Sequence, residues 1–180
     1  MKKYLPFFFI FLLIAGGISA QEVSEKVNSN KARVVINIIN NTEWPAGSNA
    51  EFDTFTISVI GQPAFVEKLK QLSTQELKSI KNVAIRTVSA EDDLSGSSMV
   101  IVSENDLSVL ANVLKKVENK PILTVSDIEG FARYGIIAEL APAGDGSGQI
   151  EYLINKMVLR KSGLKISEDI INKAKKTYGK

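Results

Sequence analysis

The stretch KPILTVSDIEGFARYGIIAEL, residues Lys120–Leu140, contains the pattern that decides the fold. Its apolar and largely β-branched run, Ile122–Val125, is bounded by a proline and by a polar pair, which is typical of a buried strand. A short amphipathic turn follows and ends at Gly135, and a second apolar run begins at Ile136. The stretch therefore predicts a strand, a turn and another strand.

Several polar and aromatic side chains of this stretch are candidate binding residues. In open α/β sheets, ligands bind where strand ends meet loops, and Ser126, Asp127, Phe131 and Arg133 follow the predicted strand. The alternative interpretation is that Ser126 and Asp127 only cap the turn after the strand, which is the commonest role of these residue types at such positions.

Strands and helices alternate upstream of this stretch. Before Ile122–Val125, the patterns predict three strands, at Phe55–Ile60, Val83–Val88 and Met99–Val102. A helix is expected to open at Pro63. A second helix carries an apolar stripe made of Leu107, Leu110, Ala111, Leu114 and Val117. This alternation indicates βαβ units, so we expect a single α/β domain with a largely parallel central sheet and flanking helices.

Two capping signals help to place the helix boundaries. Ser73 with Glu76 resembles a capping box for a short segment that carries Leu77, and Ser103 with Asp106 resembles another one ahead of the second helix. We expect each pair to mark the start of a helix.

The pattern changes after the opening stretch. Ile136–Leu140 and Gln149–Ile154 are apolar enough for strands, and Ala141–Gly148 between them is rich in glycine. A phosphate-binding loop would need a helix directly after the glycines, so we predict a C-terminal β-hairpin instead. Further helices are predicted at Asn155–Ser162 and from Ser167 into the basic C-terminus.

The first twenty residues resemble a secretory signal peptide. Two lysines give a positive start, Leu5–Ala15 is an apolar segment, and small residues precede a cleavage site between Ala20 and Gln21. The apolar segment is too short for a comfortable membrane span, which needs about 20 residues. We therefore expect a protein exported to the periplasm, with a domain that starts at Gln21 and a polar, frayed terminus up to Lys31.

The mature chain has no cysteine and no histidine, and its formal charge is zero. Removal of the two N-terminal lysines leaves 20 basic and 20 acidic residues. Disulfides, cysteine nucleophiles and histidine-based catalysis are excluded, and a zinc site is not expected. The acidic run Glu91–Asp93 lacks the alternating ligand spacing of an EF-hand loop. Without the basic footprint of a nucleic-acid binder, we predict no metal, no cofactor and no nucleic-acid partner.

Trp44, the only tryptophan, has two interpretations. Tryptophan side chains are usually highly buried, which favours a core role for Trp44 at the loop that continues with Pro45. Stacking on a bound ligand is the alternative, so Trp44 is kept among the candidate binding residues.

Several segments of the chain resemble the YfiR-like proteins. The resemblance lies mainly in PILTVSDIEGFARYGIIAEL, in QIEYLIN at Gln149–Asn155 and in SGLKISEDIINKAKK at Ser162–Lys176. Further upstream, EWP at Glu43–Pro45 and SVIG at Ser58–Gly61 resemble early landmarks of that family. Members often have a second glycine where this chain has Ile136.

The resemblance implies a small periplasmic α/β protein without enzymatic activity. The best-known members of the family hold an inner-membrane diguanylate cyclase of cyclic-di-GMP signalling inactive by binding its periplasmic sensor domain, and related domains accompany histidine kinases. Redox switching by cysteines, which some members allow, cannot apply to a chain without cysteine. The resemblance also favours a helix over a strand for Ala32–Ile39, whose β-branched residues fit both.

The leading hypothesis is a regulatory protein that binds the periplasmic domain of an inner-membrane signalling protein. Aromatic and arginine side chains are common interface anchors. The interface expected on this basis is the turn beyond the strand, with Asp127, Ile128, Phe131, Arg133 and Tyr134. The alternative is that Phe131 packs inward and leaves only Arg133 and Tyr134 exposed. A homodimer is a further option for the partner.

Two other hypotheses belong to different functional classes. The second is a periplasmic small-ligand receptor with a pocket near Trp44 and Phe131. The third is a hydrolase that uses carboxylates such as Asp53 or Asp127, although the lack of histidine and cysteine weighs against catalysis.

The sequence predicts export and cleavage after Ala20. N-terminal sequencing of the protein from the envelope fraction should return Gln21 as the first residue, because the small residues before it fit signal peptidase. Recovery of the full-length chain from the cytoplasm would contradict this prediction.

Overall fold

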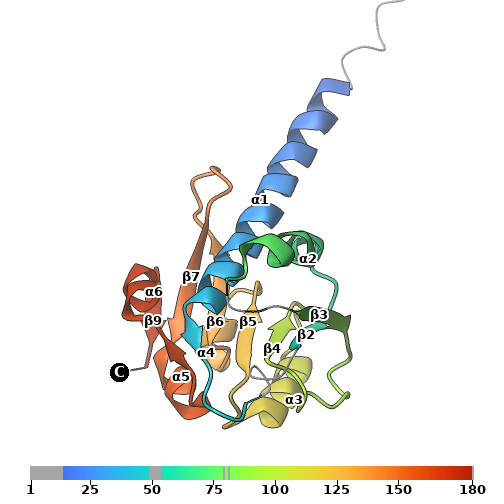
Figure 1. Cartoon of the computed structure of the whole chain (residues 1–180). Coiled ribbons are helices and arrows are strands. Elements are labelled where there is room, and N and C mark those ends of the chain that lie inside the picture. The colour runs from blue at the N-terminus through green and yellow to red at the C-terminus, as the bar shows by residue number, and fades with distance from the viewer. Residues whose placement is uncertain (1–13, 49–53, 79, 81, 180) are drawn as a thin grey trace, which may run out of the picture.

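The computed structural model of the chain describes residues 14–48, 54–78, 80 and 82–179. Its helices are α1 Ile14–Asn40, α2 Phe65–Glu76, α3 Leu107–Val117, α4 Phe131–Tyr134, α5 Lys156–Ser162 and α6 Glu168–Lys173 (Figure 1). Its strands are β1 Thr42–Glu43, β2 Phe55–Ile60, β3 Val83–Thr87, β4 Met99–Val102, β5 Leu123–Ser126, β6 Ala138–Pro142, β7 Ile150–Asn155, β8 Lys165–Ile166 and β9 Lys176–Tyr178. The main sheet has the order β3-β2-β4-β5-β6-β7-β9, and β1 pairs with β8.

The strand order shows how the chain builds the sheet. After β2, the chain places β3 on one side, crosses back to place β4 on the other side, and continues outward through β5 and β6. This is the 2-1-3-4-5 order of one class of doubly wound sheets. Each pairing in the main sheet is parallel except that of the hairpin β6–β7. The predicted α/β fold, with a largely parallel sheet and a C-terminal hairpin and helices, is confirmed.

The face of the sheet below α1 and α2 is apolar. Val59, Ile101 and Val125 face the same way on neighbouring strands. They belong to one buried core with Ile38 of α1 and Leu69 of α2. The helical interpretation of residues 32–39 is therefore correct, since their β-branched side chains fill the space between α1 and the sheet.

The opposite face of the sheet, below α3, mixes apolar and polar side chains. Val100 of β4 packs with Leu110 of α3 in a second core. The register places Thr124, Ser126 and Glu139 on the same side of the neighbouring strands, and all three are buried. Buried polar groups need hydrogen-bond partners. The partners of these three side chains are described with the candidate site.

Helix α3 begins at an aspartate cap. The Asp106 carboxylate accepts hydrogen bonds from the hydroxyl and the backbone N–H of Ser108, at 2.6 and 2.7 Å, which together hold the pKa of Asp106 below its ordinary value. The predicted contribution of Ser103 to this cap is wrong. Ser103 directly follows β4 and donates its hydroxyl to Asp127, which directly follows the neighbouring strand β5.

The starts of the other helices differ in how they are capped. The hydroxyl of Ser73 lies inside α2 and donates to the carbonyl of Lys70 at 3.0 Å, so the expected capping box does not form. Ser167 occupies the position before α6 but makes no capping hydrogen bond. Asn155, in contrast, caps α5 by accepting the N–H of Val158 at 3.0 Å.

Helix α1 continues through the segment that was expected to be frayed. Residues 21–31 are helical because other elements hold them: Asn30 donates to the Gly148 carbonyl in the hairpin loop at 2.8 Å, and Lys68 of α2 pairs with Glu25 at 2.6 Å. The end of α1 nearest the N-terminus extends beyond the sheet (Figure 1). Among the described residues, no helix is long and apolar enough to cross a membrane.

The C-terminus forms a strand rather than the end of a helix. Helix α6 ends at Lys173, and β9 then pairs in parallel with β7 at the edge of the sheet. Thr177 and Tyr178 are residue types that favour strands, but the neighbouring lysines resembled a helix C-terminus.

Only part of the apolar stripe on α3 belongs to the core. Leu110, Val113 and Val117 are buried, whereas Leu107 is 60% exposed and Ala111 is exposed. The helix therefore meets the sheet along the line of Leu110 and Val113, and the other apolar residues lie to one side of that contact.

Leu110→Ala should lower the free energy of unfolding by about 2–5 kcal/mol, because Leu110 is only 2% exposed and its removal leaves a cavity. Leu107→Ala is the matched control on the same helix, and it should change stability by no more than about 0.5 kcal/mol. Urea unfolding of both variants measures the difference, and equal effects would contradict this assignment of the core.

Candidate binding site

The connection between β5 and β6 is unusually short for a parallel crossover. Residues 127–137 carry the chain between these strands, and their only helix is the single turn α4. Parallel strands usually need a dozen or more residues, most often with a full helix. A full helix would supply its own backbone hydrogen bonds and cover the sheet, so a single turn needs other partners.

Two buried side chains provide these partners. The Glu139 carboxylate, on β6, is 2% exposed and accepts the backbone N–H groups of Gly130 and Ala132 at 3.1 and 2.8 Å. The Asn155 amide, at the end of β7, donates to the Ala132 carbonyl at 2.7 Å. A four-residue helix cannot satisfy its own ends, so these contacts fix α4 to the hairpin.

The residues directly after β5 are also engaged in structural contacts. The Ser126 hydroxyl donates to the Val102 carbonyl at 2.6 Å and accepts the N–H of Ile128 at 3.0 Å. Asp127 pairs with Lys31 of α1 at 2.8 Å and accepts the hydroxyl of Ser103. The capping interpretation therefore describes Ser126, and Asp127 joins α1 to the start of the turn.

The turn presents two of the candidate interface residues to solvent. Tyr134 is 58% exposed and Arg133 is exposed. Phe131 is 2% exposed and belongs to the core below α3, and Ile128 is half-buried against the same core. Phe131 therefore cannot be a surface anchor, because the amphipathic turn directs it toward the sheet.

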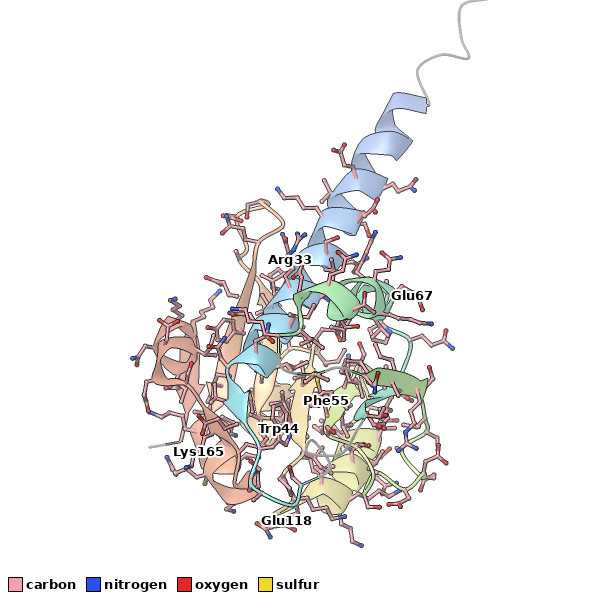
Figure 2. The ribbon with its side chains drawn as sticks, viewed as in Figure 1. Arg33, Trp44, Phe55, Glu67, Glu118 and Lys165 are labelled. Carbon is pink, nitrogen blue, oxygen red and sulfur yellow. The ribbon has the colours of Figure 1, made fainter. Side chains whose placement is uncertain are left out.

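Trp44 has the predicted core role. Its ring is half-buried and packs edge-on against Phe55, with ring centroids 5.2 Å apart, and its indole N–H donates to the Ser98 carbonyl at 3.4 Å (Figure 2). Trp44 packs against the core below α1, whereas Phe131 belongs to the core on the other face of the sheet. The expected pocket near Trp44 and Phe131 is therefore wrong, and Asp53 lies outside the described residues.

Two backbone segments approach each other closely at the place of the usual ligand crevice of a doubly wound sheet. That crevice would lie beyond the ends of β2 and β4, where the strand order reverses. Gly61 follows β2, and a Cβ atom at this position would lie 3.0 Å from the carbonyl carbon of Ser103. The Ser103 N–H also donates to the Ile60 carbonyl at 2.9 Å, so the two segments are in direct contact after the strands end.

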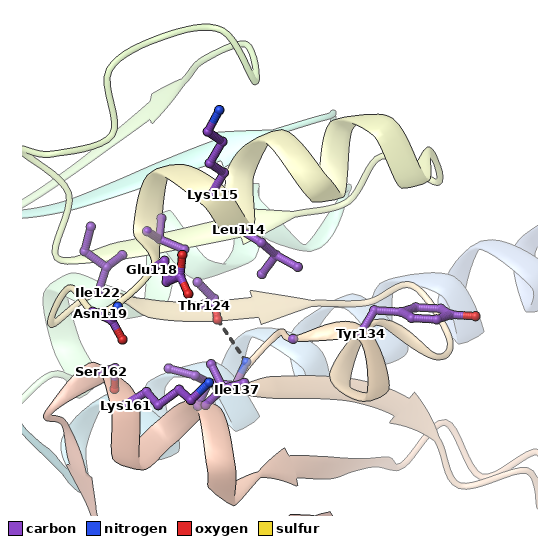
Figure 3. Close-up of a pocket in the computed structure, with 13 residues that line it drawn as sticks. Leu114, Lys115, Glu118, Asn119, Ile122, Thr124, Tyr134, Ile137, Lys161 and Ser162 are labelled. Atoms are coloured by element: carbon purple, nitrogen blue, oxygen red, sulfur yellow. Dashed lines mark hydrogen bonds between the residues drawn. The ribbon is translucent and has the colours of Figure 1, made fainter.

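A pocket of about 310 Å³ instead lies between α3, α4 and α5 (Figure 3). Its apolar lining includes Leu114, Ile122, Ile137 and Val158. The Thr124 hydroxyl in the wall accepts the N–H of Ile137 at 2.9 Å. The rim carries Tyr134, Lys115, Glu118 and Lys161. The sequence feature that could have indicated this pocket is the short spacing between the predicted strands Ile122–Val125 and Ile136–Leu140. A connection with little helix covers less of the sheet beside α3.

The polar clusters of the described residues do not form a metal site. The part of the chain that the structure describes contains no group of three or more His, Cys, Asp or Glu side chains that could hold a metal ion. In the acidic run, Asp92 accepts the N–H of Ser89 at 2.7 Å. Hydrogen bonds from the hydroxyl and N–H of Ser95 lower the pKa of Asp93. These carboxylates therefore shape an exposed loop.

Comparisons with known proteins give one family and several similar solved structures. The family described as YfiR/HmsC-like matches residues 28–175, and no curated protein matches the chain. A conserved domain protein from Vibrio cholerae is 14% identical with a TM-score of 0.52, over 83% of this chain and 60% of that chain. The ABC domain in complex with L-tryptophan from Streptococcus pneumoniae is 16% identical with a TM-score of 0.43, over 68% and 55%. The chain thus spans 55–60% of their lengths, and the Vibrio likeness shows the fold alone.

Glu139→Gln should lower the free energy of unfolding by about 1.5–3 kcal/mol, the usual contribution of hydrogen bonds to a charged group. The substituted amide keeps the shape of the side chain but turns an NH₂ group toward a backbone donor. Glu129→Gln, on an exposed side chain of the same turn, is the control and should change stability by no more than about 0.5 kcal/mol. Equal urea midpoints for both variants would contradict the role given to Glu139.

Proposed function

The chain belongs to the YfiR/HmsC-like family, and from this membership we propose that it is a non-enzymatic regulator of an inner-membrane signalling protein. It acts by binding the periplasmic domain of that protein, which is of the diguanylate cyclase or histidine kinase type. Family membership carries the proposal, and the fixed turn 127–137, which presents Arg133 and Tyr134 to solvent, is the candidate contact surface.

The construction of the turn favours recognition of a protein. Arginine and tyrosine are enriched among the residues that contribute most to protein interfaces. Glu139 and Asn155 already hold the backbone that presents them. A partner therefore binds a surface that is ordered beforehand, and less conformational entropy is lost on binding.

The hydrogen bonds of Asp127, the carboxylate considered for catalysis, support a role without catalysis. Both carboxylate oxygens of Asp127 have partners, one in Lys31 and one in Ser103. A general base needs a free position within reach of a substrate proton. The chain also has no cysteine or histidine to act as a nucleophile or proton carrier.

The expected place of action is the periplasm. Family membership and the signal-like N-terminal segment both support export. The cleavage point between Ala20 and Gln21 lies within α1, so cleavage there would leave Gln21–Asn40 as the first helix of the mature protein. A second copy of the chain is the alternative partner.

A small-ligand receptor is the second candidate function, and the pocket beside α3 favours it. Its volume of about 310 Å³ and its apolar lining suit a small organic molecule. The site of such a ligand would be bounded by Leu114, Ile137 and Val158 rather than by Trp44. A ligand could then change partner binding by preferring one of two states of the protein.

Crosslinking in the native envelope, followed by mass spectrometry, tests the proposed function. The expected product joins this chain to an inner-membrane signalling protein. Arg133→Glu should reduce capture at least about tenfold, the effect of losing about 1.4 kcal/mol of binding free energy, without lowering the melting temperature. Lys70→Glu, on an exposed side chain of α2, makes the same change of charge as a control. Capture of outer-membrane proteins alone would contradict the proposal.

A further inference from the structure

Helix α3 has a second apolar line that does not face the sheet. Leu107, Ala111 and Leu114 are spaced at i, i+4 and i+7, so they lie on one side of the helix. Leu107 and Ala111 are exposed, and Leu114 is half-buried. Leu107 is the one large exposed side chain of this line, and together with Tyr134 it makes up two of the four large hydrophobic residues that are exposed in the described part of the chain. Exposed apolar surface that adjoins a pocket is typical of an interaction site.

This line leads into the pocket beside α3. Leu114 is part of both, and its Cδ1 atom lies 3.0 Å from the position that a Cβ atom would take on Gly135. Tyr134 forms part of the pocket wall next to Gly135, and Figure 3 shows its ring directed away from the pocket. Together, the apolar line Leu107–Ala111–Leu114, Tyr134 and the pocket form what we call the α3–α4 groove.

We propose that the α3–α4 groove receives an amphipathic helix from the periplasmic domain of the partner. The proposal rests on the proposed function, since it names the surface through which that function is performed. Apolar residues of the docked helix contact Leu107 and Ala111, and one large apolar side chain enters the pocket above Ile122 and Ile137. This is the arrangement in which an amphipathic helix lies in a groove and anchors at helical spacing.

The charges beside the groove define the chemistry of the docked helix. Lys115 and Lys161 line the rim of the pocket, and Arg133 precedes Tyr134 on α4. Figure 3 shows the Lys115 side chain directed away from the pocket, where it can flank a docked segment. Glu118 is the one acidic residue of the pocket lining. Basic residues therefore prevail at the pocket end, whereas the exposed Glu104 and Asp106 precede Leu107 at the other end. A partner helix with acidic residues beside its anchor and basic residues at its other end complements this distribution.

The spacing of the groove also limits the size of the contact. The line from Leu107 to Leu114 covers two helical turns, about 10 Å along the axis. The pocket has room for a large side chain at the end of that line. The contact therefore consists of a short helical segment with one deeply bound anchor, as in interfaces where a few residues contribute most of the affinity.

A photo-crosslinking amino acid introduced into the full chain tests this proposal in the native envelope. Positions 107 and 111 probe the groove, and positions 70 and 173 are exposed controls on α2 and α6. The expected result is capture of an inner-membrane signalling protein from the groove positions alone, through a peptide with apolar residues at helical spacing and acidic neighbours. Leu107→Glu should reduce this capture at least about tenfold without changing the melting temperature, whereas Lys70→Glu should not.

Each other outcome overturns the inference in a distinct way. Capture of the signalling protein from the control positions alone would leave the proposed function intact and reject the groove. Capture of a second copy from positions 107 and 111 would make the groove a contact between identical chains. A small molecule that co-purifies with the chain, with no crosslink at the groove, would make the pocket a ligand site. Absence of a crosslink from all four positions would contradict both the groove and the proposed function.

Discussion

The short crossover between β5 and β6 is the constraint on which the rest of the site depends. Residues 127–137 contain only the single turn α4, which cannot satisfy its own backbone. Glu139 and Asn155 must then be buried to supply hydrogen bonds. The pocket beside α3 adjoins this turn through Tyr134 and Gly135. One short connection therefore explains the buried polar groups and the fixed turn.

The two faces of the sheet differ in the side chains that they carry. The face below α1 and α2 is filled by apolar side chains, among them Val59 and Ile101, and provides most of the core. The face below α3 has a smaller core beside buried polar groups, among them Thr124 and Glu139, which hold the crossover. The larger core and the proposed recognition surface thus lie mainly on opposite faces of one sheet, and Lys31–Asp127 is a direct contact between α1 and the turn.

The sequence predicted the fold better than it predicted the site. The apolar patterns identified the strands and helices of the sheet. Ile101, for example, lies in a continuous apolar run that forms the buried strand β4. The strand β9 and the helical segment 21–31 were missed because partner elements distant in sequence stabilise them. The orientation of Phe131 and the separation of Trp44 from it depend on how layers pack, which local patterns do not contain.

The turn contains residues that hold its backbone and residues that are only exposed on its surface, and this difference has an evolutionary consequence. Glu139, Asn155 and Ser126 are committed to the scaffold, and their replacement disturbs the backbone. Arg133 and Tyr134 are exposed. Substitutions at exposed positions usually change the free energy of unfolding by no more than about 0.5 kcal/mol. Under the proposed function, chains that share this scaffold can therefore change partner through a few surface substitutions while the backbone that carries them stays the same.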